Sequence, residues 1–443
     1  MQHKKIVIAG GTGFIGQEMI AHFGDRNDLV ILTRHPQRNS GRTRYVYWNA
    51  ETLHGWETHL EGADLLINLA GKSVNCRYNA RNRKEIFNSR TNATAVLGQA
   101  ILTLAHPPRL WVNAASATIY RHAEDRPMDE YSGEIENDFS VQVCKRWEQT
   151  FNDFTLPHTR KVILRIAITL GARGGVMVPY LNLAKYGLGG HQGHGRQMFS
   201  WVHVTDLCRM IAWLYGQPQL DGTFNCSAPH PVSNRTFMRT LRKVSGHTFG
   251  LPAPAWLLAL GARMIGTETE LLLKSRWVLP TRITQAGFTF RYPYLREALE
   301  DISSKMQEKI TYLHAIMETA PNGNKKLTVV LGASANPQRY SFLAVSRLKT
   351  HGHPVVAIGK RAAQIADTPV IQEHPALDNV DTVTLYLNPQ RQREYYDYIL
   401  QLRPKRLIFN PGTENNELQQ LALQHGIQPI AACTLVMLST GQY

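Results

Sequence analysis

The feature that most constrains this chain is a glycine-rich turn that joins its first apolar run to its first amphipathic stretch. The run IVIA is followed at residues 10–16 by Gly-Gly-Thr-Gly-Phe-Ile-Gly. In such a turn Gly10 permits the tight bend, Gly13 lets the backbone approach a pyrophosphate, and Gly16 lets helix and strand pack closely. The helix N-terminus then offers unpaired N–H groups to the phosphates. The turn therefore predicts a dinucleotide site whose contacts are Gly10, Thr12, Gly13, Phe14, Ile15 and Gly16.

The first three hundred residues alternate β-rich apolar runs with helical patterns. The apolar runs are KKIVIAG, DLVILTR, ADLLINLAG, RLWVNAAS and RKVILRIAITLG. Strands that alternate with helices imply βαβ crossovers and a parallel sheet. We therefore expect an α/β fold: a Rossmann-type doubly wound parallel sheet over residues 1–302, with a small substrate-side lobe over about residues 223–302.

A second unit is expected after a linker over residues 303–324. This segment is polar and helix-prone at first and ends in the cluster PNGNKK, which is typical of a linker. Strand-like runs then restart as LTVVLGASANP, PVVAIGK, TVTLYLNP, KRLIFNPG and QPIAACTLVML. The pattern predicts a second, smaller Rossmann-like α/β domain over residues 325–443.

The end of the second apolar run distinguishes between the two nicotinamide cofactors. An NAD site usually carries a carboxylate there, which accepts hydrogen bonds from the ribose hydroxyls. This chain has Thr33 and Arg34, with Arg38 and Arg42 close behind, and a guanidinium can pair with a 2′-phosphate. NADP is therefore favoured, and a solvated surface side chain is the alternative for Arg34. Three residues at the end of the run ADLLINLAG are also expected to contact the cofactor: Leu69, Ala70 and Gly71.

The composition narrows the class of protein further. With 49 Lys and Arg against 34 Asp and Glu the net charge is +15, but the basic residues are scattered. A basic surface that serves anionic small ligands explains this charge, so no nucleic-acid partner is expected. No apolar stretch reaches the roughly 20 residues of a membrane span, and the N-terminal run leads into the glycine turn rather than a cleavage site. These two observations lead us to expect a cytoplasmic protein. No metal site is expected, because the five cysteines lack a C-x-x-C pair.

Several motifs of the first 302 residues together resemble the extended short-chain dehydrogenase/reductase superfamily, which includes the nucleoside-sugar epimerases. They are GGTGFIG, ADLLINLAGKSV, NAASATIY, DFSVQVCKRWE, SWVHVTDL and the pattern PxxxxxxGFxFxYPxLxxAL between Pro280 and Leu299. Within the superfamily the chain is most similar to an atypical epimerase-like family of NADP-dependent oxidoreductases. The resemblance implies a Rossmann fold, NADP as cofactor and a small-molecule substrate.

The resemblance also implies a catalytic set, from which this chain departs. Superfamily members use a Ser or Thr to hold the substrate oxygen, a Tyr to exchange the proton, and a Lys four residues later to lower the pKa of that tyrosine. Ser116 matches the serine and Lys145 matches the lysine, which would also contact the cofactor, but Val141 stands in the place of the tyrosine. Tyr120 is a candidate replacement, since a nearby ammonium would lower the pKa of its phenol. Its alternative role is to pack beside the nicotinamide.

Three other positions are assigned from their local surroundings. In the segment Trp201 to Asp206, Asp206 is expected to cap a helix and His203 to be structural. Arg90 follows a helical run, where it either faces an anionic substrate or lies on the surface.

The second unit is similar to the CoA-binding domain of the succinyl-CoA synthetase α-subunit type. The turn after its first strand lacks three spaced glycines, but Gly332 and Ser334 allow a phosphate to approach the next helix. The residues expected to bind CoA or an acyl-CoA are Gly332, Ala333, Ser334, Asn336, Arg339 and Lys360. The phosphohistidine domain of those synthetases is absent from this chain, so no ligase chemistry is expected, and a unit that binds nothing is the alternative. Cys433 is expected to be a buried thiol in an apolar strand.

Two functions remain open from the sequence. The first is an NADP-dependent oxidoreductase or epimerase-like enzyme that acts on an unidentified small substrate and carries a CoA-binding module. The second is a non-catalytic regulatory protein that senses NADP and acyl-CoA. Retention of Ser116 and Lys145 favours the enzyme, whereas Val141 favours the sensor.

Overall fold

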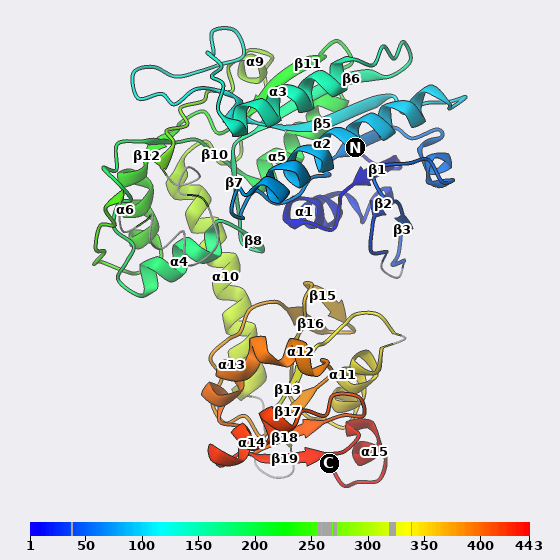
Figure 1. Cartoon of the computed structure of the whole chain (residues 1–443), viewed down its shortest axis with the longest axis vertical. Helices are drawn as coiled ribbons and strands as arrows, with labels where there is room; N and C mark the ends of the chain where they lie inside the picture. The colour runs from blue at the N-terminus through cyan, green and yellow to red at the C-terminus, as the bar shows by residue number, and fades with distance from the viewer. Residues whose placement is uncertain (37–38, 256–257, 259–267, 269–272, 319–324, 338) are drawn as a thin grey trace. The chain divides into compact units, whose positions relative to one another are not determined.

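The chain forms two compact units, Met1–Met306 and Gln307–Tyr443 (Figure 1). The structure is a computed structural model that describes every residue except 37–38, 256–257, 259–267, 269–272, 319–324 and 338. Each unit is built around its own parallel sheet, so the expected α/β fold class is confirmed. Among the described helices, none is both long and apolar enough to cross a membrane.

A seven-stranded parallel sheet forms the centre of the first unit. Its strand order is β11-β6-β5-β4-β1-β2-β3. The chain winds outward in both directions from the neighbours β1 and β4, and ligands of such sheets bind outside the carboxyl ends of the strands at this point. The strands are β1 Lys5–Ala9, β2 Asp28–Thr33, β3 Thr43–Tyr47, β4 Leu65–Asn68, β5 Leu110–Ser116, β6 Arg160–Ile166 and β11 Gly222–Cys226.

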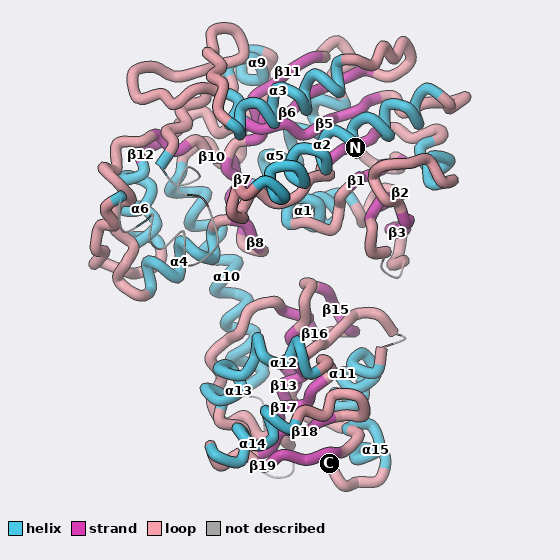
Figure 2. The backbone as a smooth tube through the Cα atoms, in the orientation of Figure 1, coloured by secondary structure: helices cyan, strands magenta, loops and turns pink. Residues whose placement is uncertain are grey.

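Helices cover both faces of this sheet (Figure 2). In β1, Ile6 and Ile8 pack into the core shared with α1 and α5, whereas Val7 and Ala9 pack into the core shared with α2 and α3. Successive side chains of a strand point to opposite faces, and a strand covered on both faces therefore reads as an unbroken apolar run. The elements are α1 Phe14–Phe23, α2 Ala80–Leu102, α3 Phe139–Asn152, α5 Val204–Tyr215, η1 Trp56–Leu60 and η2 Ala117–Ile119.

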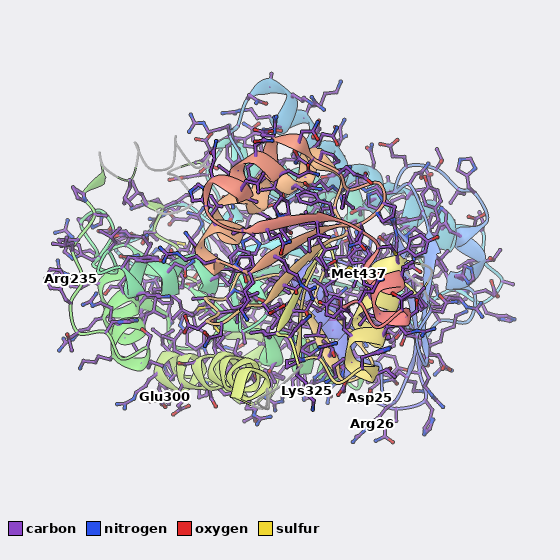
Figure 3. The ribbon with its side chains drawn as sticks, turned by 90° about the horizontal axis from the view of Figure 1, so that it is seen from below. Asp25, Arg26, Arg235, Glu300, Lys325 and Met437 are labelled. Atoms are coloured by element: carbon purple, nitrogen blue, oxygen red, sulfur yellow. The ribbon has the colours of Figure 1, made fainter. Side chains whose placement is uncertain are left out.

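The smaller lobe of the first unit has different limits from those expected. Residues 223–226 belong to β11 at the edge of the main sheet, whereas residues 168–203 supply much of the lobe's own core. Arg235 of α6 and Glu300 of α10 lie on its exposed side (Figure 3). The elements are β7 Ile168–Gly171, β8 Gly174–Gly175, α4 Met177–Lys185, β9 Met198–Phe199, β10 Trp201–His203, β12 Val232–Ser233, α6 Asn234–Val244 and α10 Leu295–Glu318; α9 Thr281–Gln285 packs beside the main sheet.

The segment expected as a linker is helical for most of its length. Helix α10 begins in the lobe, where Ala298, Leu299 and Ile302 enter the core, and it continues to Glu318. Residues 319–324, which include most of the Pro/Gly/Asn cluster, lie outside the described residues.

The second unit has a seven-stranded sheet of order β15-β16-β14-β13-β17-β18-β19. All neighbours are parallel except the pair β15 and β16, a hairpin that the sequence pattern did not predict. Its elements are β13 Thr328–Leu331, α11 Tyr340–Thr350, β14 Val355–Ile358, β15 Ala363–Ile365, β16 Thr368–Ile371, β17 Thr382–Leu385, α12 Pro389–Gln392, η3 Arg393–Tyr395, α13 Tyr396–Leu402, β18 Arg406–Phe409, α14 Asn416–Gln424, β19 Gln428–Ala431 and α15 Thr434–Ser439.

The last apolar run does not form a single strand, and the expected placement of Cys433 in a strand was wrong. Strand β19 ends at Ala431 and α15 begins at Thr434, because the Thr434 N–H donates to Asn410 Oδ1 at 2.8 Å and turns the chain. Cys433 is the half-buried residue that precedes this helix.

Candidate functional site

The glycine turn after β1 brings the backbones of two strand ends into contact. Gly10 has φ +75°, and a Cβ on it would lie 2.9 Å from the Cα of Ala70, which follows β4. A Cβ on Gly16 would overlap the backbone of Gly11, so α1 can lie against the turn only when residue 16 is glycine. The roles expected of Gly10 and Gly16 therefore have a direct steric basis.

The N-terminus of α1 is open to a ligand. Gly13 is its N-cap residue, is exposed, and has no side chain that could cap the helix N–H groups. A Cβ on Gly13 would meet nothing closer than 3.9 Å, so the space beside the turn is free. Unpaired N–H groups and free space at a helix N-terminus fit a pyrophosphate. The ring of Phe14 instead packs against Gly171 and Gly175 of the lobe, and Ile15 packs into the core below the sheet.

The end of β2 presents a cation rather than a carboxylate. Thr33 is buried and its Oγ1 accepts the His35 N–H at 3.2 Å, which turns the chain and leaves the Arg34 side chain exposed. Arg42 lies 3.8 Å from Asp28 and so has a carboxylate partner. No described carboxylate pairs with Arg34, and Arg38 lies outside the described residues.

The end of β4 is shaped by a buried asparagine whose role sequence reasoning missed. Asn68 donates from Nδ2 to Asn113 Oδ1 at 2.7 Å and to Thr94 Oγ1 at 3.1 Å, and its Oδ1 accepts the Ala70 N–H at 3.0 Å. These bonds set the path of Leu69, Ala70 and Gly71 beside Gly10. The signal that was available is the pair of asparagines in neighbouring strands, Asn68 at the end of β4 and Asn113 in the middle of β5, which are aligned in the strand register.

Two hydroxyl groups lie at the carboxyl end of β5. Ser116 Oγ donates to Thr118 Oγ1 at 2.9 Å and accepts the Thr118 N–H at 3.2 Å. Both residues are half-buried, so the pair is accessible from the strand-end edge. Ser116 stands where its motif predicts, and Thr118 was not singled out from the sequence.

Helix α3 leaves Lys145 exposed to solvent. Val141 is fully buried, and the helix packs Cys144 into a core with Ala117 and Tyr120, next to Ser116. Lys145 follows Cys144 by about 100° around the helix and is exposed to solvent. The pairing of Ser116 with Lys145 that the motif implies therefore stays a prediction.

Tyr120 is also not positioned for proton exchange. Its side chain is 1% exposed, its hydroxyl donates to Asn225 Oδ1 at 3.0 Å, and it accepts from Arg165 Nη1 at 2.8 Å. Arg165 in turn pairs with both oxygens of Glu148 at 2.8 Å. Burial raises the pKa of Tyr120, which opposes ionisation of the phenol. The expected activation of Tyr120 is thus replaced by a closed buried network.

The junction between the main sheet and the lobe corrects one expected detail, the residue that caps α5. The cap of α5 is His203, whose Nδ1 accepts the Thr205 N–H at 3.1 Å, and not Asp206. Asp206 instead accepts the backbone N–H groups of Arg291 and Tyr292, both at 2.8 Å. Burial lowers the pKa of His203 to about 4, so this residue is neutral near pH 7.

The second glycine turn has similar geometry. Gly332 has φ +88°, and a Cβ on it would lie 2.7 Å from the carbonyl oxygen of Tyr386. A Cβ on Gly359 would overlap the carbonyl of Ala333, so the loops after β13 and β14 lie side by side. Both loops therefore reach the same edge of the sheet, where glycine alone permits the approach.

The polar residues expected to bind CoA lie around these two loops. Ser334 Oγ accepts the Asn336 N–H at 3.3 Å, and the Asn336 carbonyl accepts the Arg339 N–H at 2.9 Å. The side chains of Arg339 and Lys360 are exposed, and Arg339 immediately precedes α11, whose start no side chain caps. The arrangement leaves two cations and a helix N-terminus at one edge, a combination suited to phosphate.

The fold and its two glycine turns define the class of this protein: a nucleotide-binding protein built from two Rossmann-like units. Residues 6–227 match the NAD dependent epimerase/dehydratase family, residues 253–302 match a domain of unknown function, and residues 326–439 match a CoA binding domain. The chain belongs to the NAD-dependent epimerase/dehydratase family and carries a CoA-binding domain behind its NAD(P)-binding domain.

Relatives of known sequence and structure match the first unit. An epimerase family protein of Staphylococcus aureus is 31% identical over 306 residues, which are 68% of this chain and 100% of that protein. An epimerase family protein of Staphylococcus saprophyticus is 32% identical over 303 residues, with coverage of 68% and 99%. The human epimerase family protein SDR39U1 (isoform 2), whose crystal structure was solved with NADPH, is 27% identical with a TM-score of 0.61 over 68% of this chain and 99% of that chain.

A nucleoside-diphosphate sugar epimerase from Corynebacterium glutamicum shares the fold. It is 22% identical, with a TM-score of 0.52 over 72% of this chain and 68% of that chain. At this identity the likeness concerns the fold alone.

Proposed function

We propose that the first unit binds NADP in preference to NAD and is an oxidoreductase of the epimerase-like type that acts on a small substrate. The observation that carries the cofactor assignment is the end of β2, where Arg34 is exposed without a described carboxylate partner. A guanidinium at this position can hold a 2′-phosphate, whereas the ribose of NAD would need a carboxylate. The human relative solved with NADPH gives independent support.

The cofactor assignment is tested by titrating NADPH and NADH into the full chain by calorimetry. Arg34→Ala is expected to weaken NADPH binding by roughly 10- to 100-fold, the value of a hydrogen-bonded charge pair, and to leave NADH binding unchanged. Arg26→Ala is the control, because Arg26 is an exposed arginine just before β2 begins, at the opposite end of that strand (Figure 3). Equal affinity of the wild type for the two cofactors would refute the assignment.

The chemistry we propose depends on the hydroxyl pair rather than on a tyrosine. A bound nicotinamide supplies or accepts a hydride. The residues of this chain hold the substrate oxygen: the Ser116 hydroxyl, now donating to Thr118 Oγ1 at 2.9 Å, can rotate to donate to that oxygen. A neutral hydroxyl that only donates a hydrogen bond needs no ammonium to lower its pKa, which is consistent with an exposed Lys145. The proton that completes the alcohol after hydride transfer would come from solvent water, which can reach the half-buried hydroxyl pair.

A panel of small carbonyl compounds, followed by NADPH absorbance, tests this proposal. Ser116→Ala is expected to remove turnover while NADPH binding persists. Ser132→Ala is the control, because Ser132 is an exposed serine whose hydroxyl donates to Asp129. Turnover that is undiminished in Ser116→Ala would exclude the hydroxyl pair as the substrate-holding group.

The second candidate function is a non-catalytic sensor of NADP and acyl-CoA. It is favoured by one observation: α3 buries Val141 and exposes Lys145, so the proton-exchanging pair of the superfamily is missing. Tight NADPH binding without turnover of any carbonyl in the panel, or of the corresponding alcohols with NADP, would select this function.

For the second unit we propose that CoA or an acyl-CoA binds at the edge formed by the loops after β13 and β14. The exposed side chains of Arg339 and Lys360 would pair with its phosphates. The double variant Arg339→Ala/Lys360→Ala of the full chain is expected to bind CoA at least ten-fold more weakly. Lys405→Ala is the control, because Lys405 is exposed just before β18 begins, at the opposite edge of the sheet. Equal CoA binding by the double variant, or no binding by the wild type, would refute the site.

A further inference from the structure

Arg90 is a partly buried cation in the middle of α2 that has no carboxylate partner among the described residues. Its Nη1 donates to the carbonyl of Ile86, one turn back in the same helix, at 2.9 Å. Burial lowers the pKa of Arg90, and the neighbours that oppose this effect are Cys144 and Tyr78 rather than a carboxylate. The cost of burying this charge is therefore not offset by a described acid.

Three other enclosed cations of the first unit have partners in the described part of the chain. Arg165 has Glu148, and Lys274 has Asp138. Lys161 donates to three backbone carbonyls at the end of α3. A buried charge normally has such a partner, so Arg90 differs from its neighbours in what the protein supplies to it.

The position of Arg90 relates it to the cofactor turn. Gly10 lies against the backbone of Ala70. A Cβ on Gly71, the residue after Ala70, would lie 3.1 Å from the guanidinium carbon of Arg90. The guanidinium thus lies directly against the end of β4, one residue beyond the contact with the glycine turn. Cys144, which interacts electrostatically with Arg90, packs with residues that follow the β5 end carrying Ser116.

The guanidinium rests on a rigid platform. Its central carbon is 5.2 Å from the ring centroid of Trp147. Trp147 Nε1 donates to Thr94 Oγ1 at 3.0 Å, and Thr94 is bonded to the buried Asn68 that shapes the end of β4. Stacking on a fixed aromatic face orients the planar group of an arginine while its remaining N–H donors stay available.

Several cations lie near Cys144 as well. Arg90, Arg276 and Arg165 act on this thiol, together with the anion Glu148, which is paired with Arg165. Burial raises the pKa of Cys144 to about 12, so its thiol adds no negative charge.

From this geometry we infer that Arg90 binds an anionic oxygen group, a carboxylate or a phosphate, of the substrate that lies between the β4 and β5 ends. The inference rests on the proposed NADP site and adds a substrate class to it: an anionic carbonyl compound or alcohol. The 2′-phosphate is assigned to Arg34 and the pyrophosphate to the α1 N-terminus, so the anion near Arg90 belongs to the substrate.

The test uses inorganic phosphate and succinate as probes, each titrated by calorimetry into the full chain saturated with NADPH. The wild type is expected to bind at least one of them, Arg90→Met at least ten-fold more weakly, and Arg81→Met like the wild type. Arg81 is the matched control because it lies on the same helix, fully exposed and paired with Glu85. Arg90→Lys keeps the charge but loses the planar guanidinium group, so it is expected to bind the probe several-fold more weakly than the wild type. If Arg90→Met does not fold, Arg90→Lys decides whether Arg90 binds the anion.

Three results would overturn the inference. The first is that the wild type binds neither probe. The second is that Arg90→Met, or Arg90→Lys where that variant decides, binds the probe as tightly as the wild type does. The third is that Arg90→Met loses NADPH affinity, which would assign Arg90 to the cofactor. A prior NADPH titration of the wild type separates this failure from failure of the proposed function, because the latter would show no preference for NADPH.

Discussion

Replacement of Tyr120 by phenylalanine distinguishes a structural tyrosine from a chemical one. The buried phenol accepts from Arg165 Nη1 at 2.8 Å and donates to Asn225 Oδ1 at 3.0 Å. Tyr120→Phe removes both bonds and leaves a buried guanidinium nitrogen and a buried amide oxygen without this partner. We therefore expect a loss of stability rather than a specific loss of chemistry.

The magnitude follows from the two bonds. A hydrogen bond to a charged group is worth about 1.5–3 kcal/mol and a neutral one about 1 kcal/mol. Arg165 keeps its two bonds to Glu148, both 2.8 Å long, so its share lies at the lower end. The expected loss is about 2–3 kcal/mol, which lowers the folding equilibrium constant roughly 30- to 150-fold.

Urea unfolding followed by tryptophan fluorescence measures this loss in the first unit alone, because all eight tryptophans precede residue 278. Tyr131→Phe is the matched control: Tyr131 is 66% exposed and its hydroxyl bonds to Gln285 at the surface, so a change within about 0.5 kcal/mol is expected. If Tyr120→Phe keeps the wild-type urea midpoint but loses turnover, the reasoning is refuted and Tyr120 is the proton donor.

Three further perturbations follow from the same structure. The pKa of His203, about 4 when folded, lies below its ordinary value near 6.5, so the stability that depends on neutral His203 is complete above about pH 6.5 and is lost as pH falls towards 4. The wild type should thus lose about 3 kcal/mol more than His203→Gln between pH 7 and pH 4 in urea unfolding, and equal losses would contradict the assignment. Gly16→Ala should abolish NADPH binding in calorimetry, because its Cβ would overlap Gly11. Gly13→Ala has open space around its Cβ, so it should keep the unfolding midpoint and only weaken NADPH binding. A Gly16→Ala protein that binds NADPH normally would disprove the packing argument. Gly332→Ala should weaken CoA binding more than Gly426→Ala does. Both residues have a positive φ, but only a Cβ at residue 332 would also lie 2.7 Å from a carbonyl oxygen. Equal CoA affinities of the two variants would contradict this reasoning.

Much of the fold could be predicted because the apolar runs are buried on both faces. Runs such as IVIA and VVAI become central strands, and the glycines after them mark the turns. Edge elements were harder: β3 and the hairpin of β15 and β16 have mixed polarity, since one side of an edge strand faces solvent. The run RKVILRIAITLG was expected to form one strand but divides into β6 and β7, which belong to different sheets.

The candidate site was predictable where a backbone conformation demanded a residue type and not where a helix had to be oriented. Gly10 and Gly332 are read correctly from sequence because only glycine fits their positions. The exposure of Lys145 could not be predicted, because a match of spacing to a motif says nothing of which side of α3 is buried. The apolar stripe through Val141, Cys144 and Phe151 was the available signal, and Lys145 lies beside it.

Charge compensation distinguishes the surroundings of Tyr120 from those of Arg90. The register of β5 and β6 aligns Ala115 with Arg165, so the guanidinium reaches the Tyr120 phenol, and α3 supplies Glu148 to complete the pair. No sequence pattern predicts this network, because Arg165 lies 17 residues from Glu148 and 45 residues from Tyr120 in the chain. The sequence left Arg90 open between facing an anionic substrate and lying on the surface, and the structure makes it a partly buried cation with no carboxylate partner among the described residues. The buried Tyr120 and Arg165 have their hydrogen-bond and ion-pair partners within the protein, so a role in stability explains them. Arg90 lies beside the proposed cofactor turn without a carboxylate partner among the described residues, so an anionic ligand explains it best.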